Sequence, residues 1–252
     1  MLEIRDLTFS YGKQNILSGI SFTLAQGRWL TIAGPNGSGK TTLLRLLSAY
    51  LKPDSGEIRF TGKELFSIPP DQRAKKIAYL PQNPPDLTGI TVRELIQRGR
   101  YPAPGSAMTE DDVLLLTDLT HLQHRELHQL SGGERRRAWI AMTLIRKPEL
   151  LLLDEPTAFL DPRGQFECLE MIQQLRKDLD LTVILILHDL TLAARFSDHI
   201  LFMKNGTICA EGTPEEVMTP DRIRQIFGVT AENVFTQDGG KHILLTGTSK
   251  EN

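Results

Sequence analysis

The residues with the clearest chemical potential form a glycine-rich run. Residues 34–41 read Gly-Pro-Asn-Gly-Ser-Gly-Lys-Thr and fit the phosphate-loop pattern G-x4-G-K-[ST]. An apolar strand is expected before the run at 29–33, and a helix after it at 41–51. Glycines let backbone N–H groups converge on phosphate oxygens, and a helix N-terminus attracts anions. The run therefore predicts a nucleotide site rather than a ligand-free turn between strand and helix.

Each residue type in this run has a chemical task. Lys40 would reach the β- and γ-phosphates, and the Thr41 hydroxyl would ligate Mg²⁺. The residues expected around the nucleotide phosphates are consecutive: Gly34, Pro35, Asn36, Gly37, Ser38, Gly39, Lys40, Thr41 and Thr42. A phosphate loop alone leaves kinase, GTPase, helicase and transporter ATPase open, so the rest of the chain must decide.

A buried strand predicted at 150–153 ends in two adjacent carboxylates, Asp154 and Glu155. Asp154 is placed to hold Mg²⁺ through water, as a Walker-B aspartate does. Glu155 suits a general base that polarises the attacking water. The alternative is a strand that simply ends in polar turn residues.

Two further apolar strands also end in polar side chains. Residues 77–80 precede Gln82, and residues 182–187 precede His188. The carboxyl ends of parallel strands form the edge where open α/β sheets bind ligands. A lone histidine after a strand is more often structural. The other polar residues at the same predicted sheet edge favour a catalytic role for His188.

Residues 130–134, Leu-Ser-Gly-Gly-Glu, precede a helical pattern. Ser131 and Glu134 have the spacing of a capping box. Two glycines in a first helical turn cost about 1 kcal/mol each relative to alanine, so a cap alone does not explain Gly132 and Gly133. They indicate close approach of an anion to bare backbone, and we expect that anion to be ATP bound to a partner copy.

Composition and pattern limit the class of protein. Of 252 residues, 40% are apolar and 24% charged, which is ordinary for a globular protein. The net charge of -2 predicts no nucleic-acid partner. The N-terminus lacks a signal-peptide pattern, and the longest apolar runs fall short of the ~20 residues that span a bilayer, so an intracellular setting is expected.

Three histidines need separate consideration. His121, His124 and His128 are spaced i, i+3 and i+7, which would place them on one face of a helix and could suggest a metal site. They have no accompanying cysteine or carboxylate set, so a solvated or partner-facing surface is favoured.

These motifs, in this order, resemble those of ATP-binding cassette (ABC) ATPases over about residues 2–228. The resemblance implies a P-loop NTPase fold: α/β, with an N-terminal antiparallel β-subdomain, a mainly parallel core sheet and an inserted α-helical subdomain. It implies hydrolysis of ATP with Mg²⁺. It also implies a head-to-tail dimer, in which each ATP lies between one phosphate loop and the partner's signature residues Ser131, Gly132 and Gly133.

The domain organisation follows from the same resemblance and the predicted elements. We expect one ABC ATPase domain over 1–252, with a catalytic core at about 1–82 and 147–228. The helical subdomain is expected at 83–146 and a short tail at 229–252, with one more strand pair.

The resemblance also implies roles for single residues. Tyr11 would stack on adenine, Gln82 would ligate Mg²⁺ and couple the γ-phosphate to the partner subunit, and Asp161 would lie in the loop that crosses the dimer seam. In that loop Ala158 and Phe159 replace the family's usual Ser-Ala, so a hydroxyl is missing.

Further segments are similar to the iron-siderophore, haem and cobalamin importer branch, particularly to ferric-siderophore ATPases: 79–82, 89–102, 137–142 and 211–218. The branch implies an ATPase that energises a membrane importer from its cytoplasmic face, with integral permease subunits and, indirectly, a substrate-binding protein. The alternatives are a soluble non-transport ABC ATPase and, less favoured, a P-loop kinase, which leaves the two glycines and His188 unexplained.

The permease contact is expected on one surface. Residues 83–87 and 92–100 would form part of a groove that receives a cytoplasmic permease helix, with Leu87 and Ile90 as exposed apolar anchors.

Overall fold

The structure is a computed structural model, and it describes three stretches of the chain: residues 1–100, 108–235 and 241–248. The chain forms two compact units. Unit 1 comprises Met1–Gly62 and Leu185–Asn252, and unit 2 comprises Lys63–Ile184. The helix break predicted from Pro and Gly at 101–105 lies outside the described residues.

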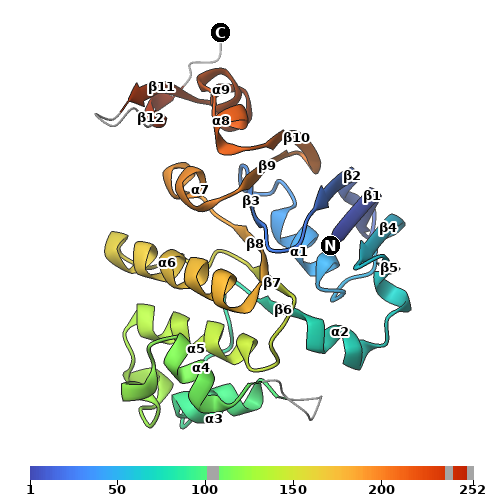
Figure 1. Ribbon diagram of the computed structural model, residues 1–252. Coiled ribbons are helices and arrows are strands. Elements are labelled where there is room, and N and C mark those ends of the chain that lie inside the picture. The colour runs from blue at the N-terminus through green and yellow to red at the C-terminus, as the bar shows by residue number, and fades with distance from the viewer. Residues whose placement is uncertain (101–107, 236–240, 249–252) are drawn as a thin grey trace. The chain divides into compact units, whose positions relative to one another are not determined.

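Unit 1 begins with an antiparallel sheet, drawn in blue and teal in Figure 1. Strand β1 (Leu2–Tyr11) pairs with β2 (Gln14–Leu24) on one side and with β4 (Ser55–Phe60) on the other. The buried apolar residues Leu2 and Ile4, and then Leu7 and Phe9, follow the two-residue period of a strand with one covered face, and the register shifts between these two pairs. The expected N-terminal antiparallel sheet is confirmed.

The remaining sheet of unit 1 places the phosphate loop. Strand β3 (Trp29–Ala33) pairs in parallel with β9 (His199–Lys204), which pairs antiparallel with β10 (Thr207–Gly212). All five residues of β3 are buried, which explains its continuous apolar sequence.

Helix α1 (Lys40–Leu47) follows the phosphate loop and is shorter than predicted. The apolar pattern favoured a helix to Leu51, but the helix ends at Leu47, with Ser48 as its C-cap. The reason is Ala49, whose φ of 58° places it in the left-handed region that ends a helix.

The C-terminal part of unit 1 combines predicted and unpredicted elements. It contains α7 (Leu190–Phe196), α8 (Pro214–Val217), α9 (Pro220–Phe227), β11 (Val229–Phe235) and β12 (Lys241–Thr248). The last two strands pair antiparallel, so the strand pair expected in the tail is confirmed. Sequence patterns did not identify α8, α9 or strand β10.

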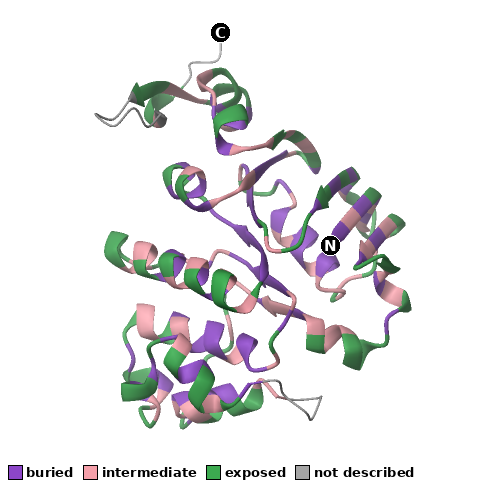
Figure 2. Cartoon of the chain, in the orientation of Figure 1, coloured by how far each residue is buried: buried purple, intermediate pink, exposed green. Residues whose placement is uncertain are grey.

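In unit 2 the parallel pairing is between β6 (Ile77–Leu80) and β7 (Leu150–Leu153). Ile77 is in register with Leu150, and Leu80 with Leu153, so both strands end at the same edge. Every residue of β7 is buried, as Figure 2 shows in purple. Strand β8 (Thr182–Ile186) is buried throughout and carries the chain from unit 2 into unit 1. The predicted mainly parallel core is confirmed.

Helices between β6 and β7 form the inserted α-helical part of unit 2. They are α3 (Val92–Arg98), α4 (Glu110–Leu116) and α5 (Gly132–Leu144). Helix α5 contacts α3, α4 and the long α6 (Pro162–Leu179), and in Figure 1 these helices lie together, coloured green to orange. The start of unit 2 adds β5 (Lys63–Glu64), the 3₁₀ helix η1 (Leu65–Ser67) and α2 (Pro70–Lys76), which were not predicted.

The three histidines do not share a helical face, so that expectation is wrong. His121 lies in one 3₁₀ helix, η2 (Thr120–Leu122), and His128 in another, η3 (Leu127–Gln129), with a turn between them. Tight three-residue turns break the 3.6-residue period on which the prediction depended. Among the described residues no group of three or more His, Cys, Asp or Glu side chains could hold a metal ion.

Across the same described stretches, no helix combines the length and the apolar character needed to cross a membrane.

Candidate functional site

The phosphate loop has a backbone that requires its glycines. Gly34, Gly37 and Gly39 have φ values of 151°, 77° and 99°. A Cβ atom on Gly34 would lie 2.0 Å from the Met203 carbonyl oxygen, and one on Gly39 would lie 2.6 Å from a Leu17 methyl group. Backbone contact therefore excludes a side chain at Gly34, and the left-handed φ disfavours one at Gly39.

The loop has the polar groups of an anion cradle. The Lys40 side chain is 6% exposed, and its Nζ donates to the carbonyl oxygens of Gly34 and Pro35, both at 2.8 Å. Gly39 is the N-cap of α1, no side chain caps that helix, and its first turn has no acidic residue. The Ser38 hydroxyl is buried and has no hydrogen-bond partner among the described residues. These features fit a bound phosphate, which accepts such donors at a helix N-terminus.

Tyr11 lies at the end of β1, and its ring is 44% exposed. It packs edge-on against Phe9 at 4.9 Å between ring centroids and pairs with Gln14 across the β1–β2 hairpin. The same hairpin reaches the phosphate loop through Leu17. Its role in stacking on adenine stays a prediction.

His188 lies two residues after the end of β8 and is exposed. The Leu187 N–H donates to the Ile32 carbonyl at 3.4 Å. The backbone next to His188 therefore lies beside the carboxyl end of β3, where the phosphate loop begins. Asp189 caps α7, and its Oδ1 accepts from the N–H groups of Thr191 (2.8 Å) and Leu192 (3.0 Å). This cap fixes the backbone next to His188.

Gln82 and the acidic pair meet at the common edge of β6 and β7 in unit 2. The Asp154 N–H donates to the Leu80 carbonyl at 2.9 Å, which continues the parallel pairing into the site. Gln82 Nε2 donates to Glu155 Oε2 at 2.5 Å, and Tyr79 Oη lies 3.5 Å from Asp154 Oδ2. Asp154 is 2% exposed, whereas Glu155 has a φ of 48°. The structure thus brings together three of the predicted site residues.

Arg136 is a residue that the motif analysis missed. Its side chain is 8% exposed and donates to the backbone of the segments that carry Gln82 and Glu155. Burial lowers the pKa of this guanidinium. It lies between two other arginines, so nothing in this run of charge distinguishes it in the sequence. The signal that could have identified it is the apolar pair Trp139 and Ile140 at i+3 and i+4, which indicates that its helix face is buried.

The predicted capping box at the start of α5 is confirmed. The Glu134 N–H donates to Ser131 Oγ at 3.3 Å, and Glu134 Oε2 accepts from the Ser131 N–H at 2.8 Å. Hydrogen bonding of the Glu134 carboxylate to Ser131, first to its backbone N–H and then to its side chain, lowers the pKa of this carboxyl. A Cβ on Gly133 would meet nothing within 4 Å, and one on Gly132 would meet only a Leu160 methyl group at 3.7 Å. The packing of the described chain therefore does not require these two glycines.

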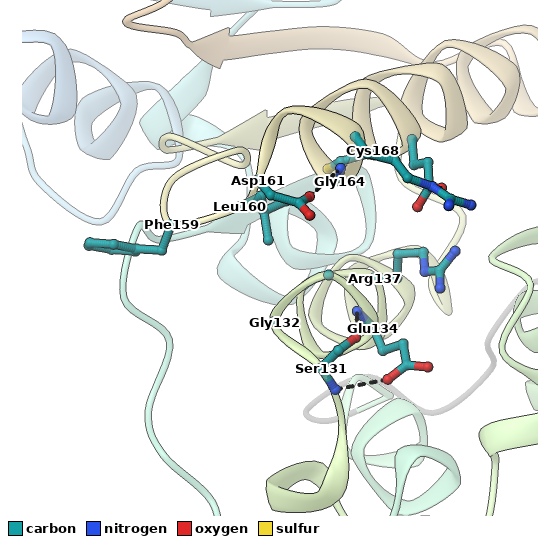
Figure 3. Close-up of a pocket in the computed structure, with 12 residues that line it drawn as sticks. Ser131, Gly132, Glu134, Arg137, Phe159, Leu160, Asp161, Gly164 and Cys168 are labelled. Atoms are coloured by element: carbon teal, nitrogen blue, oxygen red, sulfur yellow. Dashed lines mark hydrogen bonds and ion pairs between the residues drawn. The ribbon is translucent and has the colours of Figure 1, made fainter.

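A cavity of about 390 Å³ opens beside Ser131–Glu134 and is bounded by the first turns of α6. In Figure 3 Asp161 and Arg137 lie around it, and the Phe159 ring points away from it. Asp161 caps α6, with its Oδ1 accepting from the Gly164 N–H at 2.7 Å. Burial raises the pKa of the Cys168 thiol, which also lines the cavity, to about 12, as expected for an unreactive packing residue.

A second cavity of about 380 Å³ corrects the predicted permease groove. It lies between residues 82–87 and α5, with Leu87 and Trp139 in its lining, whereas no residue of α3 lines it. Ile90 is 7% exposed and is not an exposed anchor, and the apolar residues of α3 are buried against α5. The amphipathic pattern of residues 92–100 reflects packing within unit 2 rather than a binding surface.

The chain is similar in sequence to known ATP-binding subunits. It is 37% identical over 253 residues to the iron(3+)-hydroxamate import ATP-binding protein FhuC of Bacillus subtilis (strain 168), covering 97% of this chain and 94% of FhuC. It is also 37% identical over 243 residues to the hemin import ATP-binding protein HmuV of Bordetella avium (strain 197N), covering 92% of this chain and 93% of HmuV.

The fold is similar to that of solved cassettes. The structure of cbiO1 from Clostridium perfringens, part of the ABC transporter complex cbiONQ, matches with a TM-score of 0.79 and 29% identity, over 89% of this chain and 92% of cbiO1. The sequence profile of the ABC transporter family matches residues 17–158. These similarities favour a transporter cassette over a P-loop kinase. The chain belongs to the ABC transporter family, and it is an ATP-binding, ATP-hydrolysing subunit of that family.

Proposed function

We propose that residues 34–42 bind the phosphates of ATP, with Lys40 at the β- and γ-phosphates and Tyr11 on adenine. The uncapped N-terminus of α1 and the buried Ser38 hydroxyl support this assignment. Mg²⁺ would be held by Thr41, Gln82 and Asp154, a set of oxygen ligands of the kind this ion prefers. The ion would neutralise charge that develops on the β- and γ-oxygens.

We further propose Glu155 as the general base. It would accept a proton from water as the water oxygen bonds to the γ-phosphorus and the bond to the ADP oxygen breaks. The observation that carries this assignment is the 2.5 Å hydrogen bond from Gln82 to Glu155 at the shared edge of β6 and β7. That contact orients the carboxylate, and it leaves the amide oxygen of Gln82 as the atom that can ligate Mg²⁺. His188 would sense the γ-phosphate.

The signature residues Ser131, Gly132 and Gly133 are proposed to face the ATP of a second copy in a head-to-tail dimer. The open space above both glycines supports this, because nothing else in the described chain requires them. Asp161 would lie at the seam of the dimer, in the loop where Phe159 is 89% exposed.

We propose that the subunit energises import of a ferric siderophore, with haem or cobalamin as the alternative cargo. The similarity over nearly the whole chain to FhuC supports a hydroxamate siderophore, and the similarity to HmuV supports haem. Its partners would be integral permease subunits, which it joins at the cytoplasmic face of the membrane, and indirectly a substrate-binding protein.

The test of the catalytic assignment is Glu155→Gln. The amide cannot accept the proton, so hydrolysis should fall by about 10²- to 10⁴-fold while ATP still binds. Trapping of the ATP-bound state should also accumulate a dimer, which light scattering would detect. Glu149→Gln is the matched control, because Glu149 is a half-buried glutamate just before β7 that pairs with Lys76. Wild-type hydrolysis by Glu155→Gln would refute the assignment.

The test of cargo is uptake. Cells that carry the permease genes should accumulate a radiolabelled ferric hydroxamate only with an active subunit, and Glu155→Gln should abolish uptake. Uptake of haem with no uptake of ferric hydroxamate would assign the subunit to the alternative cargo.

A further inference from the structure

All five N–H groups of the Arg136 guanidinium donate hydrogen bonds to main-chain carbonyls. Nε donates to Pro156 at 2.9 Å, Nη1 to Pro81 and Gln82 at 3.4 and 3.2 Å, and Nη2 to Asp154 and Glu155 at 3.0 and 2.8 Å. A guanidinium has five N–H groups in a planar fork, so none remains for a nucleotide. The side chain therefore acts on the backbone of two segments and not on the substrate.

The two segments are those that carry the proposed hydrolytic pair. Pro81 and Gln82 follow β6, and residues 154–156 follow β7. The Gln82–Glu155 hydrogen bond of 2.5 Å depends on the relative position of the two backbones that Arg136 joins. Each carbonyl is held by a charged donor, which is stronger than a neutral one and costly to remove from a buried site.

Arg136 also connects this pair to the start of α5. It lies four residues after Gly132, on the same face of the helix and one turn away. Gly132 borders both cavities of about 390 and 380 Å³, whereas Arg136 borders the second. A displacement of the first turn of α5 is thus carried by one rigid side chain to the backbones of Gln82 and Glu155.

We propose that Arg136 is a positioning residue for ATP hydrolysis, which aligns Glu155 with Gln82 and makes that alignment depend on the position of the Ser131–Gly133 turn. The inference rests on the proposed role of Glu155 as general base. It assigns to Arg136 the task of coupling the signature turn to that base.

The test separates positioning from stability. Arg136→Gln should lower kcat by about 10- to 100-fold, because misplacing a catalytic group by about 1 Å costs on that order. KM for ATP should stay within about twofold, because the five donors of Arg136 are all engaged within unit 2 and Lys40 belongs to unit 1. Arg136→Lys keeps the charge but offers at most three donors, so its kcat should be intermediate.

Arg146 provides the matched control. It follows α5, donates to the carbonyls of Gly99 and Ala74 at 2.6 and 2.9 Å, and has a pKa lowered by burial, as Arg136 has. Arg146→Gln should lower the melting temperature, as Arg136→Gln does, yet leave kcat unchanged at temperatures where both variants are folded. Equal losses of kcat in the two variants would overturn the proposal.

A double-mutant cycle on kcat distinguishes positioning from a purely structural role. In a Gln82→Ala background the orienting contact to Glu155 is gone, so Arg136→Gln should cost clearly less kcat than in wild type. Additive losses would refute the coupling. If Glu155→Gln hydrolyses ATP normally, the proposed base is wrong. If Glu155→Gln is inactive but Arg136→Gln retains wild-type kcat, only the inference about Arg136 fails.

Discussion

At the residue scale, two buried cations of the described chain, Lys40 and Arg136, show different uses of one physical constraint. A buried charge must be compensated, and both Lys40 and Arg136 are compensated by main-chain carbonyls. Lys40 donates to two carbonyls of its own loop and has three donors, so its ammonium can exchange partners for phosphate oxygens. Arg136 has all five donors engaged and is suited to holding backbone in place.

Lys40→Ala tests the proposed role of Lys40 in phosphate binding. The substitution removes the cation proposed to contact the β- and γ-phosphates, and a charged hydrogen bond is worth about 1.5–3 kcal/mol. ATP affinity should therefore fall roughly 10- to 100-fold in a fluorescent-nucleotide titration, with hydrolysis falling at least as far. Lys52→Ala, at an exposed lysine beyond α1, should bind ATP as wild type does. Unchanged hydrolysis by Lys40→Ala would contradict the phosphate-loop assignment.

At the scale of elements, the first turn of helix α5 contains two glycines that lower the stability of the helix. Gly132 and Gly133 occupy positions where alanine would fit without a clash. Gly99, which follows α3, is different, because a Cβ there would lie 2.2 Å from the Met142 carbonyl oxygen. The same residue type is thus required by packing at one position and by a proposed external ligand at the other two.

Substitutions at these glycines separate the two causes. Gly133→Ala should keep or raise the melting temperature, since alanine favours a helix by up to about 1 kcal/mol, whereas Gly99→Ala should lower it. Gly133→Asp should still bind ATP but should neither dimerise nor hydrolyse it normally, because a carboxylate would oppose the partner's phosphates. An ATP-dependent dimer of Gly133→Asp in light scattering would contradict the proposed sandwich.

The capping box of α5 predicts a dependence of stability on pH. The folded-state pKa of Glu134 is lowered from its ordinary value of 4.5, so the folded state favours the ionised form. Its contribution is complete above the unfolded-state pKa and is lost as the pH falls through the lowered folded-state pKa. The difference in free energy of unfolding between wild type and Glu134→Gln should therefore be larger at about pH 7 than at about pH 3, measured by urea denaturation. A difference that is constant with pH would show that the box contributes no charge-dependent stability.

At the scale of the whole molecule, the proposed import function requires the chain to contact a membrane permease. The cavity between residues 82–87 and α5 is the proposed docking surface, and Leu87 is its half-buried apolar anchor. It is lined by Gln82 and Arg136 as well, so the surface proposed to contact a permease includes the residues proposed to align the base.

Leu87→Glu tests this surface. A desolvated carboxylate opposes apolar burial, so co-purification with the permease and chelate uptake should both be lost. ATPase activity of the isolated subunit should stay near that of wild type. Thr88→Glu, at the adjacent exposed residue outside the cavity lining, should retain association. Normal uptake with Leu87→Glu would place the permease contact elsewhere, and loss of isolated ATPase activity would show that Leu87 supports the fold.

Sequence patterns alone determined the motifs and most of the elements that carry them. The limits of β3, β6 and β7 match the predicted strands, because a short apolar run leaves a local signal in the sequence. The capping box at Ser131–Glu134 is likewise local, since its geometry is set by residues within one turn.

Only the tertiary structure decided what depends on distant contacts. The separate 3₁₀ turns of the histidine segment and the burial of Ile90 involve hydrogen bonds between residues 90–93 and 123–127, which the local pattern does not include. The same holds for Arg136, which lies on α5 and donates to carbonyls that follow β6 and β7. Its five acceptors are backbone carbonyls, and since every residue has one, no side-chain pattern could mark them.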